Sequence, residues 1–327
     1  MPPSLQVALL GAGWIAADHA AALAKRDDVE LVAICDLDRE RAERLAPPTA
    51  AVYEGWEELL ERERVDAVWV CLPPLHHREP TVNALARGIH VYLEKPIART
   101  PDDAEAIVAA AARSGSVCAV GYQWHATEVL DDLREALADQ EIALVVGRSI
   151  GPTGSRPWFL DRAQGGGNIL ERGSHQIDLV RAIAGEVDRV QAAASDVLLG
   201  QAEGERGDIE DAATLVLHLA GGGLATIVVG WTRDGQPGLY GADVVATEST
   251  LHLTLDPDFS LDGVSRGRTV RARSREHPFM RSIGRFFEAV HTGDPARVFC
   301  TPADAARTLA VAAACERALA SGATVAV

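Results

Sequence analysis

The sequence predicts an α/β domain with a doubly wound parallel sheet, followed by an α+β domain with an open, mainly antiparallel mixed sheet. In the first third, short runs rich in Val, Ile and Leu alternate with helix-length amphipathic segments. This alternation is typical of strands buried on both faces and joined by right-handed crossovers. After Gly121 the apolar runs lengthen and follow one another through short turns such as Gly221-Gly222-Gly223, as in antiparallel sheets. We therefore expect one domain over 1–122 and a second over 123–327.

The elements are predicted from the period of the apolar residues. Strands of the first domain are expected at 5–10, 29–35, 66–71, 89–93 and 117–121, with helices at 14–25, 38–46, 55–62, 77–87 and 101–113. The second domain is expected to contain helices at 125–138, 168–184, 278–291 and 302–320, a Gly/Pro-rich loop at 151–167, and strands at 143–150, 189–199, 212–220, 224–231, 240–247 and 250–255.

Composition and charge exclude several classes of protein. The chain has 327 residues, and 31 Lys and Arg against 47 Asp and Glu give a net charge of −16. This acidity argues against a nucleic-acid or anionic-membrane surface, because both need patches of Lys and Arg. No apolar run is as long as a membrane span, and the N-terminus has no secretory pattern. Five cysteines without a CxxC pair indicate reduced thiols in a cytoplasmic protein and no disulfide framework or metal site.

The first chemical motif follows the strand at 5–10. Gly11, Gly13 and Ala16 match GxGxx[GA], and the next strand ends in Asp36, twenty residues past Ala16. In such a loop the first glycine permits the tight turn and the second lets the backbone approach a pyrophosphate at a helix N-terminus. The acid can accept hydrogen bonds from the ribose hydroxyls of NAD. The alternative is a structural glycine turn that binds nothing.

Two further motifs follow buried strands at the edge where open α/β sheets bind ligands. Leu72-Pro73-Pro74 sets an extended path that leads to His77, and this path could line a nicotinamide ring. His77 is equally well explained as a surface residue or a helix cap. Glu94-Lys95-Pro96 follows the next strand, where Lys95 could handle a substrate hydroxyl proton. The alternative for Lys95 is a surface lysine on a loop.

The fourth motif is a glycine-rich loop, 165–167, that runs into a helix carrying Glu171, His175 and Asp178. At spacings i, i+4 and i+7 the three side chains share one face of an α-helix. A histidine with a carboxylate one turn away is a plausible general acid–base pair. The alternative is a structural pair, and a metal site is disfavoured because no further imidazole or soft ligand is nearby.

Taken together, the four motifs resemble those of the Gfo/Idh/MocA oxidoreductases, from the Gly11 loop to the closing segment ATVAV. The resemblance implies a Rossmann domain followed by an open mixed sheet. It also implies reversible hydride transfer between NAD(P) and a secondary alcohol carbon of a sugar, inositol or related polyol.

The resemblance also implies roles for individual residues. Lys95, His175 and Glu171 are the expected catalytic residues. Residues expected to bind the cofactor are Gly11, Gly13, Trp14, Ile15, Asp36, Leu72, Pro73, His77, Glu94, Lys95 and Gln123. Residues expected to bind the substrate are His125, Trp158 and Arg172. The chain departs from the family pattern at Glu171, where Asp is usual, at Leu72, where Thr is common, and at His125, where many members have Arg.

We therefore expect a cytoplasmic NAD-dependent dehydrogenase that acts on a small polyol or sugar. NADP is the less suitable cofactor, because its 2′-phosphate would meet Asp36 and the nearest cation in the sequence is Arg39. The sequence leaves open whether Lys95 or His175 is the immediate base, and dihydrodiol or imine substrates also remain open. One alternative is a glycosidase that oxidises its substrate transiently. Another is a non-catalytic NAD(H)-binding regulator, which would be expected to lack the lysine or the histidine.

A homodimer or homotetramer is expected from the strands at 212–220 and 224–231. Both faces of these strands carry apolar side chains, and the helices at 168–184 and 278–291 are expected to cover only one face. A second copy would cover the other, because monomers rarely expose a large apolar patch. The resemblance implies the same surface. The alternative is that segment 254–275 folds across the open face.

Overall fold

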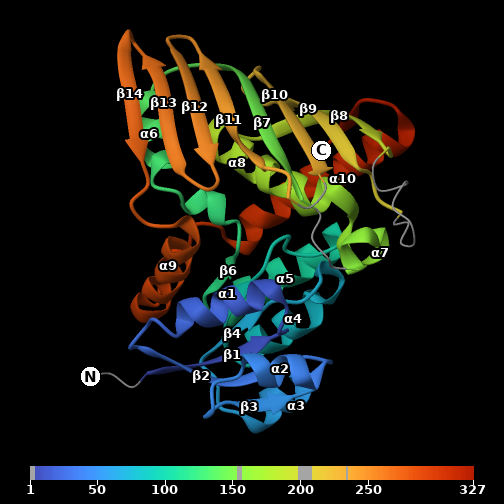
Figure 1. Cartoon of the computed structure of the whole chain (residues 1–327), viewed down its shortest axis with the longest axis vertical. Coiled ribbons are helices and arrows are strands. Elements are labelled where there is room, and N and C mark those ends of the chain that lie inside the picture. Colours follow the sequence, from blue (N-terminus) through green and yellow to red (C-terminus); the bar gives the residue numbers. More distant parts are fainter. Residues whose placement is uncertain (1–3, 153–156, 198–207, 233–234) are drawn as a thin grey trace. The chain divides into compact units, whose positions relative to one another are not determined.

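A computed structural model describes residues 4–152, 157–197, 208–232 and 235–327, and Figure 1 shows their elements. Two structural units are present. The first consists of Met1–Gly121 and Ile283–Ala306, and the second of Tyr122–Ser282 and Arg307–Val327. The chain thus passes into the second unit next to the expected boundary, but it also returns to the first unit for a segment that the sequence did not assign there.

Parallel strands make the sheet of the first unit, in the order β3-β2-β1-β4-β5-β6 (Figure 1). The doubly wound sheet is confirmed. Its strands are β1 (Leu5–Leu10), β2 (Val29–Cys35), β3 (Ala51–Tyr53), β4 (Ala67–Val70), β5 (His90–Leu93) and β6 (Cys118–Val120). The helices are α1 (Trp14–Leu23), α2 (Arg39–Leu45), α3 (Trp56–Arg62), η1 (Pro74–His76), α4 (Arg78–Ala86) and α5 (Pro101–Ser114). The sequence missed β3, because three residues show no recognisable period.

Four fully buried aromatic rings pack together in the first unit. Trp69 of β4 stacks on Tyr92 of β5 with centroids 5.3 Å apart. Phe286 and Phe287, from α9 (Pro278–Thr292), lie 5.0 and 5.4 Å from the Trp69 ring. The helix predicted at 278–291 therefore places these aromatic residues on the first sheet, and the expectation that it covers the second sheet was wrong. Its apolar period was visible in the sequence, but the sheet it packs on was not.

The second unit contains a mixed sheet in the order β14-β13-β12-β11-β7-β10-β9-β8-β15 (Figure 1). Only the β7–β10 pair is parallel among the pairs formed by the described residues, so the mainly antiparallel sheet is confirmed. The strands are β7 (Ile142–Pro152), β8 (Val187–Ser195), β9 (Ala212–Leu219), β10 (Leu224–Thr232), β11 (Leu239–Ala246), β12 (Ser249–Leu255), β13 (Phe259–Ser265), β14 (Arg268–Arg273) and β15 (Val325–Ala326).

Helices cover one face of this sheet. α6 (Val129–Ala136) packs on β12, β13 and β14, and α8 (Ser174–Ala184) packs on β7 and β10. Along β12 the buried side chains Leu251 and Leu253 alternate with the exposed Thr250 and His252, as expected for a sheet with one open face. Segment 254–275 extends the sheet as β13 and β14, so the alternative that it folds across the open face was wrong.

The remaining elements are η2 (Gln123–Ala126), η3 (Pro157–Leu160), α7 (Arg162–Gly165), the π-helical turn η4 (Ile169–Gly173), η6 (Pro295–Arg297) and α10 (Pro302–Ser321). Among the residues that the structure describes, no helix combines the length and the apolar character that crossing a membrane requires.

Candidate functional site

The expected cofactor residues of the first unit follow strands whose ends are aligned. Leu10 pairs with Cys35 and with Val70, and Val70 pairs with Leu93. The next residue of each strand therefore emerges at the same carboxyl edge of the sheet. This edge carries the Gly11 loop, Asp36, the loop at 71–77 and the Glu94-Lys95-Pro96 segment, on both sides of the β1–β4 pair. Here the strand order reverses, which is where ligands bind in open α/β sheets.

The Gly11 loop is built from close backbone contacts. Gly11 has φ +99°, and a Cβ there would lie 2.4 Å from the carbonyl oxygen of Cys71, so only glycine fits. Gly13 differs, because a Cβ at this position would meet no atom within 4 Å. Trp14, the first residue of α1, is 65% exposed. The space in front of the helix N-terminus is therefore open, as close approach of a phosphate group requires.

Asp36 is tied to that loop. Its Oδ2 accepts a hydrogen bond from Ala12 N at 2.8 Å, and its Oδ1 accepts one from Asp38 N at 2.9 Å. The nearest cation in space is Arg41, whose Nη1 lies 3.7 Å from Oδ1. Arg39, the nearest cation in the sequence, pairs with Glu43 instead.

The side chain of Leu37 directly follows Asp36 and is 92% exposed. Sequence analysis did not select it. The available signal was an apolar residue directly after the acid at the end of this strand.

His77 is buried and connects two loops of this edge. Its Nε2 lies 2.7 Å from Leu72 O, and its Nδ1 lies 2.9 Å from Pro96 O. Burial lowers the pKa of His77, although the two carbonyl oxygens oppose that change. The interpretation of His77 as a surface residue is wrong, and its side chain makes no helix-capping hydrogen bond. The imidazole instead holds the loop after β4 against the loop after β5.

Glu94 is buried next to the half-buried Lys95. Its Oε2 accepts a hydrogen bond from Lys95 N at 3.1 Å, and its Oε1 lies 2.8 Å from Nε2 of His19. Burial raises the pKa of Glu94, but the hydrogen bond from His19, the charge of Lys95 and the hydrogen bond from Lys95 N outweigh burial, so the pKa is lowered. Sequence analysis missed His19. Its position three residues after Ala16, on the buried side of α1, was the available signal.

In the second unit, the expected α-helix at 168–184 begins with a π-helical turn, Ile169–Gly173. The buried Glu210 holds this turn, because its Oε1 accepts from Ile169 N at 2.8 Å and its Oε2 pairs with Arg162 at 2.6 Å. Hydrogen bonds in a π turn run from i to i+5. Glu171 lies inside this turn, and His175 lies in the first turn of the α-helix that follows it.

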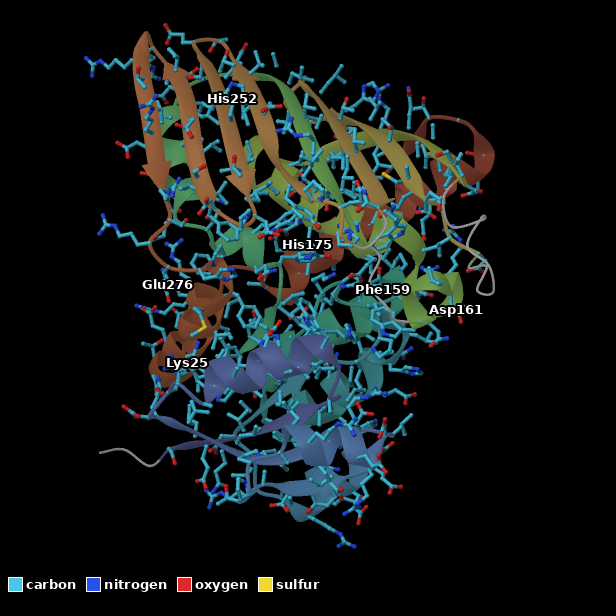
Figure 2. All side chains as sticks on the ribbon, viewed as in Figure 1. Lys25, Phe159, Asp161, His175, His252 and Glu276 are labelled. Atoms are coloured by element: carbon cyan, nitrogen blue, oxygen red, sulfur yellow. The ribbon has the colours of Figure 1, made fainter. Side chains whose placement is uncertain are left out.

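His175 is half-buried against aromatic rings. Its ring centroid lies 4.8 Å from that of Trp124 and 5.8 Å from that of Tyr122. Both rings belong to the segment that carries the expected residues Gln123 and His125 on η2. Trp124 and Tyr122 were not selected from the sequence, although they adjoin residues that were. Figure 2 labels His175 on the helix below the second sheet.

Asp178 lies next to His125, which the sequence assigned to substrate binding. Its Oδ2 lies 3.5 Å from Nδ1 of His125, and its Oδ1 accepts from Thr308 at 3.4 Å. Arg181 donates to the same threonine hydroxyl at 2.7 Å. Asp178 thus links α8 to η2 and α10.

Arg172 is fixed by neutral groups. It donates to Tyr240 Oη at 3.1 Å and to Pro152 O at 2.6 Å, and its Cζ lies 4.1 Å above the Trp231 ring. Trp231 packs on Phe159, which in turn packs on Trp158 at 4.2 Å between centroids.

The Tyr240 ring centroid also lies 6.2 Å from that of Trp124. The contacts of His175 and those of Arg172 are therefore continuous within the second unit. Flat apolar surfaces with a few fixed polar groups suit a small polar ligand such as a sugar.

Comparisons with known proteins agree with this architecture. Residues 5–122 match a family model described as an oxidoreductase family with an NAD-binding Rossmann fold, and residues 140–252 match the GFO/IDH/MocA C-terminal domain. Together the two matches extend over more than half of the chain.

Three individual proteins are informative. A D-glucoside 3-dehydrogenase of Escherichia coli (strain K12) is 35% identical over 192 residues, covering 55% of this chain and 54% of that protein. The chain thus aligns with about half the length of this relative. A myo-inositol 2-dehydrogenase of Thermotoga maritima is 28% identical over 309 residues and 90% of each chain. The solved structure of a levoglucosan dehydrogenase with NADH and levoglucosan has a TM-score of 0.85 at 19% identity over 99% of both chains, which shows a common fold.

Proposed function

This chain belongs to the Gfo/Idh/MocA oxidoreductases, and we propose that it is an NAD-dependent dehydrogenase that oxidises a secondary alcohol of a sugar or polyol. The observation that carries this proposal is the shared sheet edge, where Lys95 emerges in the same row as the Gly11 loop and Asp36. A potential proton-handling amine thus lies on the edge that suits a dinucleotide. The names of the sugar and inositol dehydrogenases it resembles support the class of substrate.

The residues of this edge fit NAD. Open space at Gly13 and the N-terminus of α1 suit the pyrophosphate, and the carboxylate of Asp36 suits the ribose hydroxyls. Trp14, Ile15, Leu72 and Pro73 are proposed to contact the cofactor from the same loops. The chemistry that bound NAD would supply is acceptance of a hydride from the alcohol carbon.

The remaining chemistry is proton transfer and orientation. We assign the first role to His175, which accepts the hydroxyl proton, and we assign to Lys95 the orientation of that hydroxyl and the stabilisation of negative charge on its oxygen. Glu171 orients His175. A positioned acid–base group contributes about a hundred- to ten-thousand-fold in rate. His125, Trp158 and Arg172 bind the rest of the sugar, and Gln123 contacts the cofactor.

The low lysine content of the chain supports a functional role for Lys95. The chain contains only two lysines, Lys25 and Lys95, among its 31 basic residues. A guanidinium stays protonated in proteins, whereas an ammonium group can release its proton. Where arginine supplies nearly all positive charge, a lysine at the ligand edge of the sheet supplies a compact ammonium donor, which suits the orientation and charge stabilisation assigned to Lys95.

A screen for NADH formation tests the proposal. Purified protein is mixed with NAD or NADP and a panel of inositols, aldoses, aminosugars and glycosides, and absorbance of the reduced cofactor is followed. Oxidation of at least one sugar or polyol is expected. Cleavage of a glycoside without net NADH would favour the glycosidase with transient oxidation. Tight NAD binding without turnover of any panel member would favour a regulator.

A further inference from the structure

A buried chain of contacts leads from the interior of the first unit to Lys95. The side chain of His19 is 0% exposed, and its ring lies between Trp69 and Glu94. The indole Nε1 of Trp69 donates to His19 Nδ1 at 3.1 Å. The opposite ring nitrogen, Nε2, lies 2.8 Å from Glu94 Oε1, and Glu94 Oε2 accepts from Lys95 N at 3.1 Å.

The indole of Trp69 determines which ring nitrogen of His19 donates and which accepts a hydrogen bond. An indole N–H can only donate, so Nδ1 of His19 must accept and the ring proton resides on Nε2. From there it is donated to the carboxylate of Glu94. The stack of Trp69 on Tyr92 and on Phe286 holds the indole in place. In this orientation each ring nitrogen of His19 has a partner.

The space beside the Glu94 carboxylate is just large enough for it, because residue 121 is a glycine. A Cβ on Gly121 would lie 3.1 Å from Glu94 Oε1, so a larger residue there would press on the carboxylate. Among the described residues, the groups that interact with Glu94 electrostatically include His19 from α1, the adjacent Lys95, Cys71 after β4, and His77 before α4. Of these, His19 is the one whose side chain donates a hydrogen bond to the carboxylate among the described contacts.

We propose that His19 is a positioning residue for Lys95, and that it acts through Glu94. By donating from Nε2 it keeps Glu94 ionised and oriented inside the unit, and Glu94 in turn fixes the backbone and charge environment of Lys95. Loss of this donor would leave a buried carboxylate that favours its protonated form. Lys95 would then lose a neighbouring negative charge without any change in its own side chain.

Two amide substitutions separate this role from simple packing. The amide of His19→Asn reaches about as far as Nδ1, so it can accept from Trp69 but cannot reach Glu94. The amide of His19→Gln reaches about as far as Nε2 and can donate to Glu94. The control is His90→Gln. His90 lies at the opposite end of β5, and its Nδ1 accepts from Val117 N at 2.9 Å.

The measurement follows the amine of Lys95 directly, because Lys25 is the only other lysine in the sequence. Reductive ¹³C-methylation of a Lys25→Arg protein labels one side-chain amine, that of Lys95, together with the N-terminal amine. The pH midpoint of the Lys95 resonance is then measured in this background. We expect Glu94→Gln and His19→Asn to move the midpoint down by a similar amount, because both would remove negative charge beside the amine. His19→Gln and His90→Gln should stay near the parent value.

The proposal fails if His19→Asn keeps the parent midpoint while Glu94→Gln lowers it, because Glu94 would then remain charged without the histidine. It also fails if neither substitution moves the midpoint.

The kinetic part rests on the proposed function and uses a substrate found in the screen. His19→Asn should lower kcat at least about tenfold with an NAD Kd within about twofold of the parent, and His19→Gln should recover most of kcat. A merely structural His19 would instead weaken NAD binding and thermal stability along with kcat and leave the Lys95 midpoint in place. The resonance measurement needs no substrate, so failure of the dehydrogenase assignment and failure of the His19 role are distinguishable.

Discussion

Asp36 Oδ2 accepts a hydrogen bond from Ala12 N at 2.8 Å, so the acid that follows β2 is joined directly to the glycine loop after β1. The carboxylate therefore shapes the loop. In the proposed NAD site it would also offer acceptors to a ribose, and its negative charge would face the 2′-phosphate of NADP. Arg41 lies 3.7 Å away and is shared with Asp38 at 3.2 Å, so it does not neutralise this site alone.

We predict that the protein binds NAD more tightly than NADP and that Asp36→Ala raises the Kd for NAD about ten- to a hundredfold. Hydrogen bonds to a charged group are worth about 1.5–3 kcal/mol, and every 1.4 kcal/mol is about tenfold. Titration of intrinsic fluorescence with each cofactor measures this. Asp38→Ala is the control, because Asp38 caps α2 through Arg41 N. A wild-type preference for NADP contradicts the prediction.

Lys95→Ala and His175→Ala should each lower kcat at least about a hundredfold while NAD binding changes little. Glu171→Gln should have a smaller effect, because it disturbs the orientation of His175 and not the proton acceptor itself. Steady-state kinetics together with cofactor titration separate the two effects. Lys25→Ala, which removes the other lysine, is the control. Near-normal turnover of His175→Ala would show that this ring only packs against Trp124 and Tyr122.

Glu94→Gln should destabilise the protein near neutral pH by about 1.5–3 kcal/mol, because it removes a charged acceptor from the bond with His19. The native pKa of Glu94 is lowered from 4.5. Its contribution to the free energy of unfolding is therefore fully present above about pH 4.5 and is lost as the pH falls through the native pKa. Urea unfolding at a series of pH values measures this. A stability gap between the two proteins that stays constant down to about pH 3 contradicts it.

Arg172→Ala should raise KM for the sugar about tenfold or more and change kcat less, because the guanidinium is held beside the aromatic contacts and is assigned to binding. Gly151→Ala should act similarly, since its Cβ would lie 1.9 Å from Tyr240 Oη and 3.1 Å from an Arg172 nitrogen. Arg189→Ala, an exposed arginine of β8, is the control. Unchanged KM in Arg172→Ala would remove this residue from the substrate site.

We propose that a second copy covers the open face of the second sheet, giving a homodimer or homotetramer. Leu239 and Val245 of β11 are 56% and 37% exposed there, and Leu224 of β10 is 41% exposed. Arg148 and Asp243 on this face form an ion pair, so one surface carries both signs of charge and a two-fold copy can match them.

Light scattering of dilute protein should therefore give a mass of at least twice 34.7 kDa. Val146→Lys, which places a charge in the centre of this face, should lower the mass. Val197→Lys changes an exposed valine outside the sheet and should not. A stable wild-type monomer at low concentration rules out the assembly.

Sequence reasoning succeeded where the pattern is local. Continuous apolar runs and the GxGxxA spacing identified β1, β2, the order of helices and the residues of the sheet edge. It was less successful where a contact joins distant parts of the chain. The π turn at Ile169–Gly173 is held by Glu210, which lies 41 residues from Ile169 in the sequence. The spacing of apolar residues along the helix does not reveal such a distant partner.

The roles of the histidines were hidden for the same reason. His19 meets Trp69 and Glu94 across 50 and 75 residues, and His77 meets Pro96 across 19. A single sequence shows that a histidine is present, but its function here depends on which carbonyl, indole or carboxylate the fold places beside each ring nitrogen.

The return of Ile283–Ala306 to the first unit has a consequence for biosynthesis. Trp69 and Tyr92 leave the ribosome early, but Phe286 and Phe287, which complete their packing, are made near the end of the chain. The nucleotide-binding unit therefore cannot finish folding until the sheet of the second unit has been synthesised. A fragment that stops at residue 122 would leave Trp69 without its phenylalanine neighbours, so a protein cut at the apparent domain border is expected to aggregate.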